Sequence, residues 1–184
     1  MIYTEITPNP TSLKFVTSTT FLRQGSADFP TVEEAGDSPL AQKLFDFAFV
    51  DRVFISANFV TVTKHDQFQW EEIIPMVKDL IKSYLASEEP VITGKLAEQD
   101  QMAAIPEDDD EITRKIKEVL ETHVRPAVAY DGGDIVYEDF VEGILKLKLL
   151  GSCSGCPSSV VTLKDGIEGL MTRLVPEVKM VEAV

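Results

Sequence analysis

Apolar residues recur along the first half of the chain with two periods, every second position in short runs and every third or fourth position in longer ones. Alternation is typical of a half-buried strand, and the wider spacing is typical of a helix with one apolar face. Ser38 followed by Pro39 marks a helix start, because serine caps a helix N-terminus and proline fits its first position. We therefore predict strands at residues 2–6, 13–17, 52–56 and 59–63, and helices from residue 38 and at 70–85.

The second half shows the same two periods in a different order. Apolar positions spaced as on one helix face predict an amphipathic helix at residues 112–123. Two strand patterns, at residues 135–141 and 144–150, predict a hairpin that turns at Glu142-Gly143. Pro157 suits the first position of a long helix. The apolar face of that helix holds Val160, Leu163, Ile167, Leu170, Met171 and Leu174. With a last strand at residues 178–181, the predicted order is α-β-β-α-β, with the helices on one side of a small sheet.

Between the two halves the periodicity disappears. The stretch from Glu98 to Glu111 holds seven acidic residues and no lysine or arginine, as is typical of a solvated linker. The sequence thus predicts an α+β protein with two small α/β-sandwich-like domains. We assign residues 1–88 to the N-terminal domain, 89–109 to a flexible acidic linker and 110–184 to the C-terminal domain.

Composition excludes several classes of function. The 184 residues carry a net charge of -14, and no long basic patch is present to neutralise phosphates, so we expect no nucleic-acid partner. No apolar stretch has the length of a membrane span, so we expect no membrane contact. Two cysteines are too few for a disulfide-built secreted scaffold, and no signal segment opens the sequence, which favours a cytoplasmic protein.

The chemistry of the chain is concentrated in Cys153-Ser154-Gly155-Cys156, which holds its only two cysteines. A pair with this spacing can bind a metal, close a small disulfide or attack another disulfide, and the spacing does not choose among the three. We expect the turn to lie at an exposed edge between strand and helix. Cys156 would then lie near a helix N-terminus, where backbone N–H groups favour a thiolate.

The number of sulfur ligands limits the possible metal sites. Tetrahedral zinc and an iron-sulfur cubane each take four protein ligands, and one chain supplies two thiolates. A second chain or another ligand must complete the shell. His65 and His123 were weighed for this role, but we interpret His123 as a partly buried residue at a core edge and His65 as unrelated to the turn. Gly132-Gly133 fits no phosphate-loop pattern and is interpreted as a turn.

The second half contains several linked motifs, which are Arg125-Pro126-Ala127-Val128, Asp131-Gly132-Gly133-Asp134-Ile135, Gly151-Ser152-Cys153-Ser154-Gly155-Cys156-Pro157-Ser158-Ser159, Thr162-Leu163-Lys164 and Val175-Pro176-Glu177-Val178. Together these motifs resemble the C-terminal domain of NifU and the Nfu-type iron-sulfur cluster scaffold and carrier family. The first half, with Thr7-Pro8-Asn9-Pro10 and Leu13-Lys14-Phe15, is similar to the N-terminal domain that accompanies this module in mitochondrial and some bacterial relatives. Relatives often have glutamine where this chain has Ala129, which lies away from the cysteines.

The resemblance implies that Cys153 and Cys156 bind a labile 4Fe-4S cluster, or a 2Fe-2S form, bridging a homodimer. It also implies an upstream cluster scaffold as donor, apo iron-sulfur proteins as clients, and a carrier in place of an enzyme. A chain that starts at Met1 with domain sequence favours the bacterial cytoplasm, or the mitochondrial matrix for a processed eukaryotic relative. Two alternatives use the same cysteines: a dithiol-disulfide oxidoreductase and a zinc-bridged structural dimer. Lys164 either faces the turn or is a solvated lysine, and the N-terminal domain either recognises partners or acts as a spacer.

Overall fold

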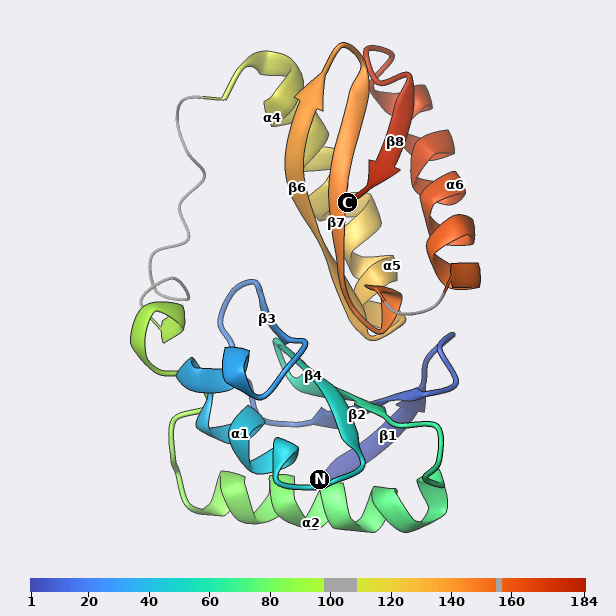
Figure 1. The fold of residues 1–184 in the computed structure, drawn as a ribbon. Helices are drawn as coiled ribbons and strands as arrows, with labels where there is room; N and C mark the ends of the chain where they lie inside the picture. The colour runs from blue at the N-terminus through green and yellow to red at the C-terminus, as the bar shows by residue number, and fades with distance from the viewer. Residues whose placement is uncertain (98–108, 155–156) are drawn as a thin grey trace. The chain divides into compact units, whose positions relative to one another are not determined.

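The computed structural model describes residues 1–97, 109–154 and 157–184, and the chain divides into two compact units, Met1–Ala104 and Ile105–Val184 (Figure 1). The first unit contains an antiparallel five-stranded sheet with the strand order β1-β2-β5-β4-β3. Four of these strands occur where alternation predicted them. The strands are β1 (Ile2–Ile6), β2 (Ser12–Thr17), β3 (Ser26–Phe29), β4 (Val50–Ser56) and β5 (Phe59–Lys64).

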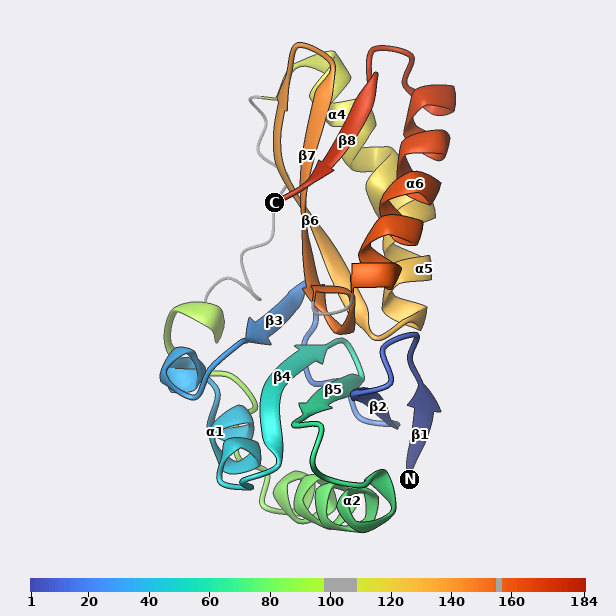
Figure 2. The same ribbon diagram turned by 45° about the vertical axis from the view of Figure 1, so that its right-hand side comes forward.

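Two helices cover one face of this sheet, α1 (Pro39–Phe45) and α2 (Trp70–Ala86) (Figures 1 and 2). Ser38 caps α1, because its Oγ accepts a hydrogen bond from the Ala41 N–H at 3.2 Å. Tyr84 is buried, and Trp70 packs against the core while its indole N–H donates to the Pro10 carbonyl. The core is formed by apolar side chains of the sheet and of both helices, including Phe15, Val53, Ile55, Val60, Val62, Leu40, Leu44, Ile73, Val77 and Ile81.

The first unit also contains structure that the sequence did not predict. Strand β3 and the 3₁₀ helix η1 (Glu33–Asp37) lie in a stretch without clear periodicity. Residues 90–97, which we predicted as part of the linker, belong to the first unit, and Val91, Ile92 and Leu96 pack against its core. Ser38 Oγ donates to the Val91 carbonyl at 2.8 Å, and the Thr93 N–H donates to the Asp37 carbonyl at 2.7 Å. These bonds to residues distant in sequence leave no periodic signal.

The second unit has the predicted order α-β-β-α-β, with its helices on one face of a three-stranded sheet (Figures 1 and 2). Strands β6 and β7 form the predicted antiparallel hairpin, and β8 pairs with β7 in parallel. Both units mix helices with a sheet, which confirms the predicted fold class. The elements are α4 (Glu111–Val119), η2 (Leu120–Val124), α5 (Arg125–Tyr130), β6 (Gly133–Val141), β7 (Ile144–Gly151), η3 (Ser152–Ser154), α6 (Pro157–Leu174) and β8 (Met180–Ala183).

The first helix of this unit is longer than predicted and contains a π turn. We predicted its end at His123, but it continues through Pro126 to Tyr130. The Arg125 N–H donates to the Leu120 carbonyl, five residues earlier, which widens the turn just before Pro126, a residue that cannot donate. A π turn contains one residue more than an α-helical turn, and this rotates the positions that follow about the helix axis. As a result Val124 is buried and His123 is exposed. The interpretation of His123 as partly buried is therefore wrong.

The last strand also differs from the prediction. It begins at Met180, whereas residues 178–181 were predicted. Val178 is buried in the core, but the N–H groups of Lys179 and Met180 both donate to the Gly143 carbonyl in the β6–β7 turn. This contact sets the start of the strand, and the sequence pattern alone does not show it. Within the described residues, no helix is both long and apolar enough to cross a membrane.

Candidate functional site

The cysteine turn connects the central strand of the second unit to its long helix. Strand β7 ends at Gly151, whose φ of 67° suits glycine, and η3 begins at Ser152. Cys153 is the middle residue of η3, and α6 begins at Pro157. Cys156, the second predicted ligand, and Gly155 lie outside the described residues. The geometry of the site is therefore that of Cys153 and its neighbours.

Cys153 is buried, with 3% of its surface exposed, and it belongs to the hydrophobic core of the second unit. The expectation of an exposed turn is wrong for this residue. Gly133, the first residue of β6, lies directly against it. A Cβ atom added at Gly133 would be 2.8 Å from the Cys153 sulfur and 2.5 Å from the Leu150 carbonyl oxygen. The sulfur thus occupies space that a side chain at residue 133 would fill.

This environment favours the thiol over the thiolate. Burial raises the pKa of the Cys153 thiol from 9.0 to about 11, and the nearby carboxylates of Asp131 and Asp134 also raise it. A thiolate is the form that attacks disulfides and binds metals. At neutral pH, Cys153 in this conformation is a protonated and shielded side chain.

Ser152 connects the cysteine turn to the turn before β6. It is buried, its Oγ donates to the Asp131 carbonyl at 2.5 Å, and its N–H donates to the Gly132 carbonyl at 3.4 Å. The Cys153 sulfur lies 3.8 Å from the same Oγ. This contact with Ser152 lowers the pKa of the Cys153 thiol, but the effect of burial is larger and the pKa stays raised.

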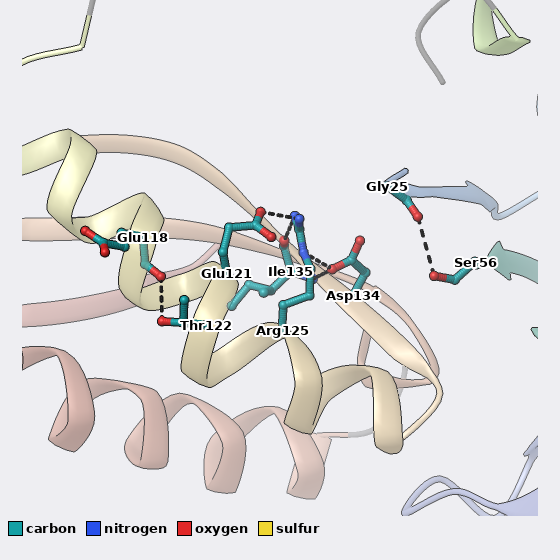
Figure 3. A network of polar contacts seen from close by, with 8 residues as sticks. All are labelled: Gly25, Ser56, Glu118, Glu121, Thr122, Arg125, Asp134 and Ile135. Atoms are coloured by element: carbon teal, nitrogen blue, oxygen red, sulfur yellow. Dashed lines mark hydrogen bonds and ion pairs between the residues drawn. The ribbon is translucent and has the colours of Figure 1, made fainter. Parts of the chain in front are cut away.

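An arginine holds the start of β6 to the preceding helix (Figure 3). Arg125 Nε donates to Asp134 Oδ1 at 2.9 Å, and Arg125 Nη2 donates to the Ile135 carbonyl at 3.1 Å. Arg125 Nη1 also pairs with Glu121. The Asp134 side chain is 6% exposed, so this carboxylate is a buried charge that the guanidinium neutralises. Gly133, next in sequence, is thereby held beside Cys153.

The other residues considered from the sequence have these surroundings within their own units. His65 is in the first unit, where its Nδ1 lies 3.4 Å from Asp51 Oδ1. His123 is exposed in η2, and its Nδ1 lies 2.7 Å from Thr122 Oγ1. Lys164 is half-buried in α6. Among the described residues, no group of three or more histidine, cysteine, aspartate or glutamate side chains is placed to hold a metal ion.

Two features of the site were not deduced from the sequence. Arg125 and Asp134 were noted only as letters of the motifs, and Ser152 was not assigned a role. Their partners are nine and twenty-one positions away along the chain. A basic residue near the end of a helix, followed by an acidic residue at the start of a strand, is the signal that was available for the first pair.

Comparison with known proteins matches both halves of the chain. Residues 2–88 match the family model described as the N-terminal domain of scaffold protein Nfu/NifU. Residues 116–182 match the model of the NifU-like domain, and this second match includes Cys153 and Cys156.

The whole chain is similar to curated relatives. It is 46% identical over 183 residues to "NifU-like protein 4, mitochondrial" of Arabidopsis thaliana, with 98% of this chain and 65% of the relative covered. It is 44% identical over 184 residues to "NFU1 iron-sulfur cluster scaffold homolog, mitochondrial" of Homo sapiens, with 100% of this chain and 71% of the relative covered. The chain thus spans about two thirds of the length of these relatives.

Solved structures are also similar, among them a solution NMR structure of a NifU-like protein from Saccharomyces cerevisiae. It is 30% identical, covers 52% of this chain and 86% of its own, and aligns with a TM-score of 0.46. Both curated relatives above are named as mitochondrial, whereas the sequence predicted a bacterial cytoplasmic protein. That location stays a prediction.

Proposed function

The chain belongs to the Nfu and NifU-like family of iron-sulfur cluster scaffold proteins, and on that premise we propose that it carries a labile iron-sulfur cluster to apo-proteins. The observation that carries this proposal is the Cys153-x-x-Cys156 pair, the only thiols of the chain, inside the matched NifU-like domain. Cys153 and Cys156 are the proposed ligands. The cluster is cargo that arrives, is held and leaves.

A homodimer follows from the number of ligands. A 4Fe-4S cluster takes four protein ligands, and one chain offers two thiolates. We therefore infer that two copies each contribute Cys153 and Cys156 to one cluster. Each protomer then holds half of the shell, so a client replaces two iron–thiolate bonds of each protomer. A 2Fe-2S cluster with the same four thiolates is the smaller form of the same cargo.

Transfer proceeds by ligand exchange. A client thiolate forms a bond to one iron as that iron's bond to a carrier thiolate breaks, and the released thiolate takes up a proton from water. Each exchange replaces one iron-sulfur bond with another, and no electron is transferred. This step requires no enzymatic group, in agreement with a carrier in place of an enzyme.

The proposed partners are an upstream cluster scaffold and apo iron-sulfur proteins. We propose that, because the two units belong to one chain, a partner bound by one unit is kept at a raised effective concentration near the other. The first unit would recognise donors or clients, and its removal would then slow transfer without changing how much cluster is loaded.

Anaerobic reconstitution tests the function. The full chain is incubated with iron and sulfide, and then iron, sulfide, zinc and molecular mass are measured for the apo and loaded forms. We expect about two iron and two sulfide per chain in a dimer, since one cubane is shared by two copies. Loaded protein should then activate an apo-acceptor with a four-cysteine site, even when a chelator is present to trap free iron.

Matched variants identify the ligands. Cys153→Ser and Cys156→Ser should each lose the cluster while the circular dichroism spectrum stays unchanged. His123→Ala should load normally, because this exposed histidine lies beside Thr122 and not at the turn. Full loading in either cysteine variant would refute the ligand assignment. A zinc-filled dimer without sulfide, or an iron-free disulfide with redox activity, would instead support one of the two alternatives.

A further inference from the structure

Cys153 cannot bind a cluster in the conformation described here. Its sulfur is packed in the core of the second unit and lies against Gly133. An iron atom needs direct access to the sulfur, and the iron must approach with the rest of its cluster. The side chain must therefore leave the core before it binds. The structure is that of a closed form.

Ser152 holds this closed form together. Its buried Oγ donates to the Asp131 carbonyl at 2.5 Å, and its N–H donates to the Gly132 carbonyl at 3.4 Å. Both bonds join η3 to the turn before β6, 21 positions away in the first case. Ser154, two residues later, differs in this respect, because its Oγ donates to the Gly151 carbonyl within its own turn at 2.9 Å.

We propose that Ser152 is a positioning residue that latches Cys153 in a closed, protected conformation, and that η3 (Ser152–Ser154) opens locally before Cys153 binds its cargo. This inference rests on the proposed function for its purpose, although the latch itself can be measured without any cluster. The closed form would shield the thiol from oxidation and from stray metal ions between deliveries. Opening breaks the Ser152–Asp131 bond and moves the sulfur away from Gly133.

The rate of thiol alkylation measures opening. In a Cys156→Ser protein Cys153 is the only thiol, and its reaction with iodoacetamide can be followed by mass spectrometry. We expect labelling of the native protein at least about 100-fold slower than labelling in denaturant at the same pH, because only open molecules react. Native labelling within a few-fold of the denatured rate would overturn the closed form.

The Ser152→Ala variant tests the latch. In the same background, loss of the Ser152–Asp131 bond should raise the native labelling rate about 5- to 10-fold. Ser154→Ala should raise it less than about 2-fold, because this hydroxyl bonds within its own turn. The thermal midpoint must be measured for both variants. Faster labelling with an equal loss of global stability, or equal rates in the two variants, would overturn the role of Ser152.

A second measurement needs no serine variant. Denaturant speeds a local opening only slightly, because little surface becomes exposed, whereas it speeds global unfolding steeply. We expect a shallow dependence of the labelling rate on low urea concentrations in the Cys156→Ser protein. A dependence as steep as that of global unfolding would mean that the turn opens only with the whole unit, and the latch would be excluded.

The two proposals fail separately. Slow, Ser152-dependent labelling in a protein that binds no iron would leave the latch intact and refute the carrier. Normal cluster loading in a protein whose Cys153 is labelled at the denatured rate would leave the carrier intact and refute the latch. Ser152→Ala with both cysteines present should load cluster faster than the unaltered chain and reach the same final iron content.

Discussion

Gly133 and Cys153 are packed so closely that a Cβ atom at residue 133 would lie 2.8 Å from the Cys153 sulfur. The contact joins the first residue of β6 to the turn after β7, and it contains no hydrogen bond. The contact is one of van der Waals packing, in which the sulfur of Cys153 fits against the backbone of Gly133 in a close-packed interior. Changes on either side of this contact are therefore expected to affect the other.

Gly133→Ala should destabilise the second unit by about 1–3 kcal/mol, because the new methyl group would clash with the Leu150 carbonyl and the Cys153 sulfur. Urea unfolding followed by circular dichroism measures this change. Gly166→Ala is the matched control, since nothing lies within 4 Å of a Cβ there and alanine favours the helix. The control should gain about 0.5–1 kcal/mol. Equal stability of the two variants would contradict the packing described for Gly133.

Arg125→Met should cost the second unit about 2 kcal/mol, because the apolar stem is kept while the buried Asp134 carboxylate loses its counter-charge. Glu121→Gln removes the charge of the other carboxylate that pairs with Arg125. The Glu121 side chain is 56% exposed, so this variant should lose less than about 1 kcal/mol of stability. Hydrogen exchange of the β6 amides reports the difference locally. A larger loss in the Glu121 variant would reverse the assignment of Asp134 as the partner that matters.

The stability of the second unit should fall as pH rises from about 9 to 11. The folded pKa of Cys153 is raised to about 11 from 9.0, so the unfolded chain loses this proton first. The stabilisation that the protonated Cys153 thiol contributes is complete below pH 9 and is lost as pH rises through 11. It amounts to at most about 3 kcal/mol, since each pKa unit corresponds to about 1.4 kcal/mol.

The effect of Cys153 is isolated by a difference between two proteins. Free energies of unfolding are measured from pH 8 to 11 for Cys156→Ser and for the same protein with Cys153→Ala. Other groups that titrate in this range contribute equally to both curves. The curves should converge as pH rises, and parallel curves would show that Cys153 is not shielded in the folded state.

Ser38→Ala should destabilise the first unit by about 2 kcal/mol. The hydroxyl both caps α1 and donates to the Val91 carbonyl, and both bonds would be lost from a fully buried position. Trp70 is the only tryptophan, so its fluorescence reports unfolding of this unit. Ser87→Ala is the control, since this exposed residue after α2 has one local hydrogen bond, to the Tyr84 carbonyl, and it should change stability by less than about 1 kcal/mol. Limited proteolysis should cut residues 90–97 faster in the Ser38 variant alone.

Much of the secondary structure could be predicted from residues close together in sequence. Alternating apolar positions located β1, β2, β4 and β5, and wider spacing located α2 and α6, because each pattern shows which face of an element avoids water. The hairpin of β6 and β7 was predicted at the right turn, where Glu142 and Gly143 both have positive φ. Strand β3 and the helix η1 were missed because they are short and have little periodicity.

The sequence by itself determined the α-β-β-α-β order of the second unit, four strands and the helices α1 and α2 of the first unit, the position of the cysteine pair and the number of thiolates that one chain can offer. Only the tertiary structure decided that Cys153 is buried against Gly133, that Ser152 bonds to Asp131, that Arg125 neutralises Asp134 and that His123 is exposed after a π turn. The physical reason is the distance along the sequence between the residues that interact. Periodicity records the water-avoiding face of a single element, whereas the environment of a thiol is set by groups that folding brings in from other parts of the chain.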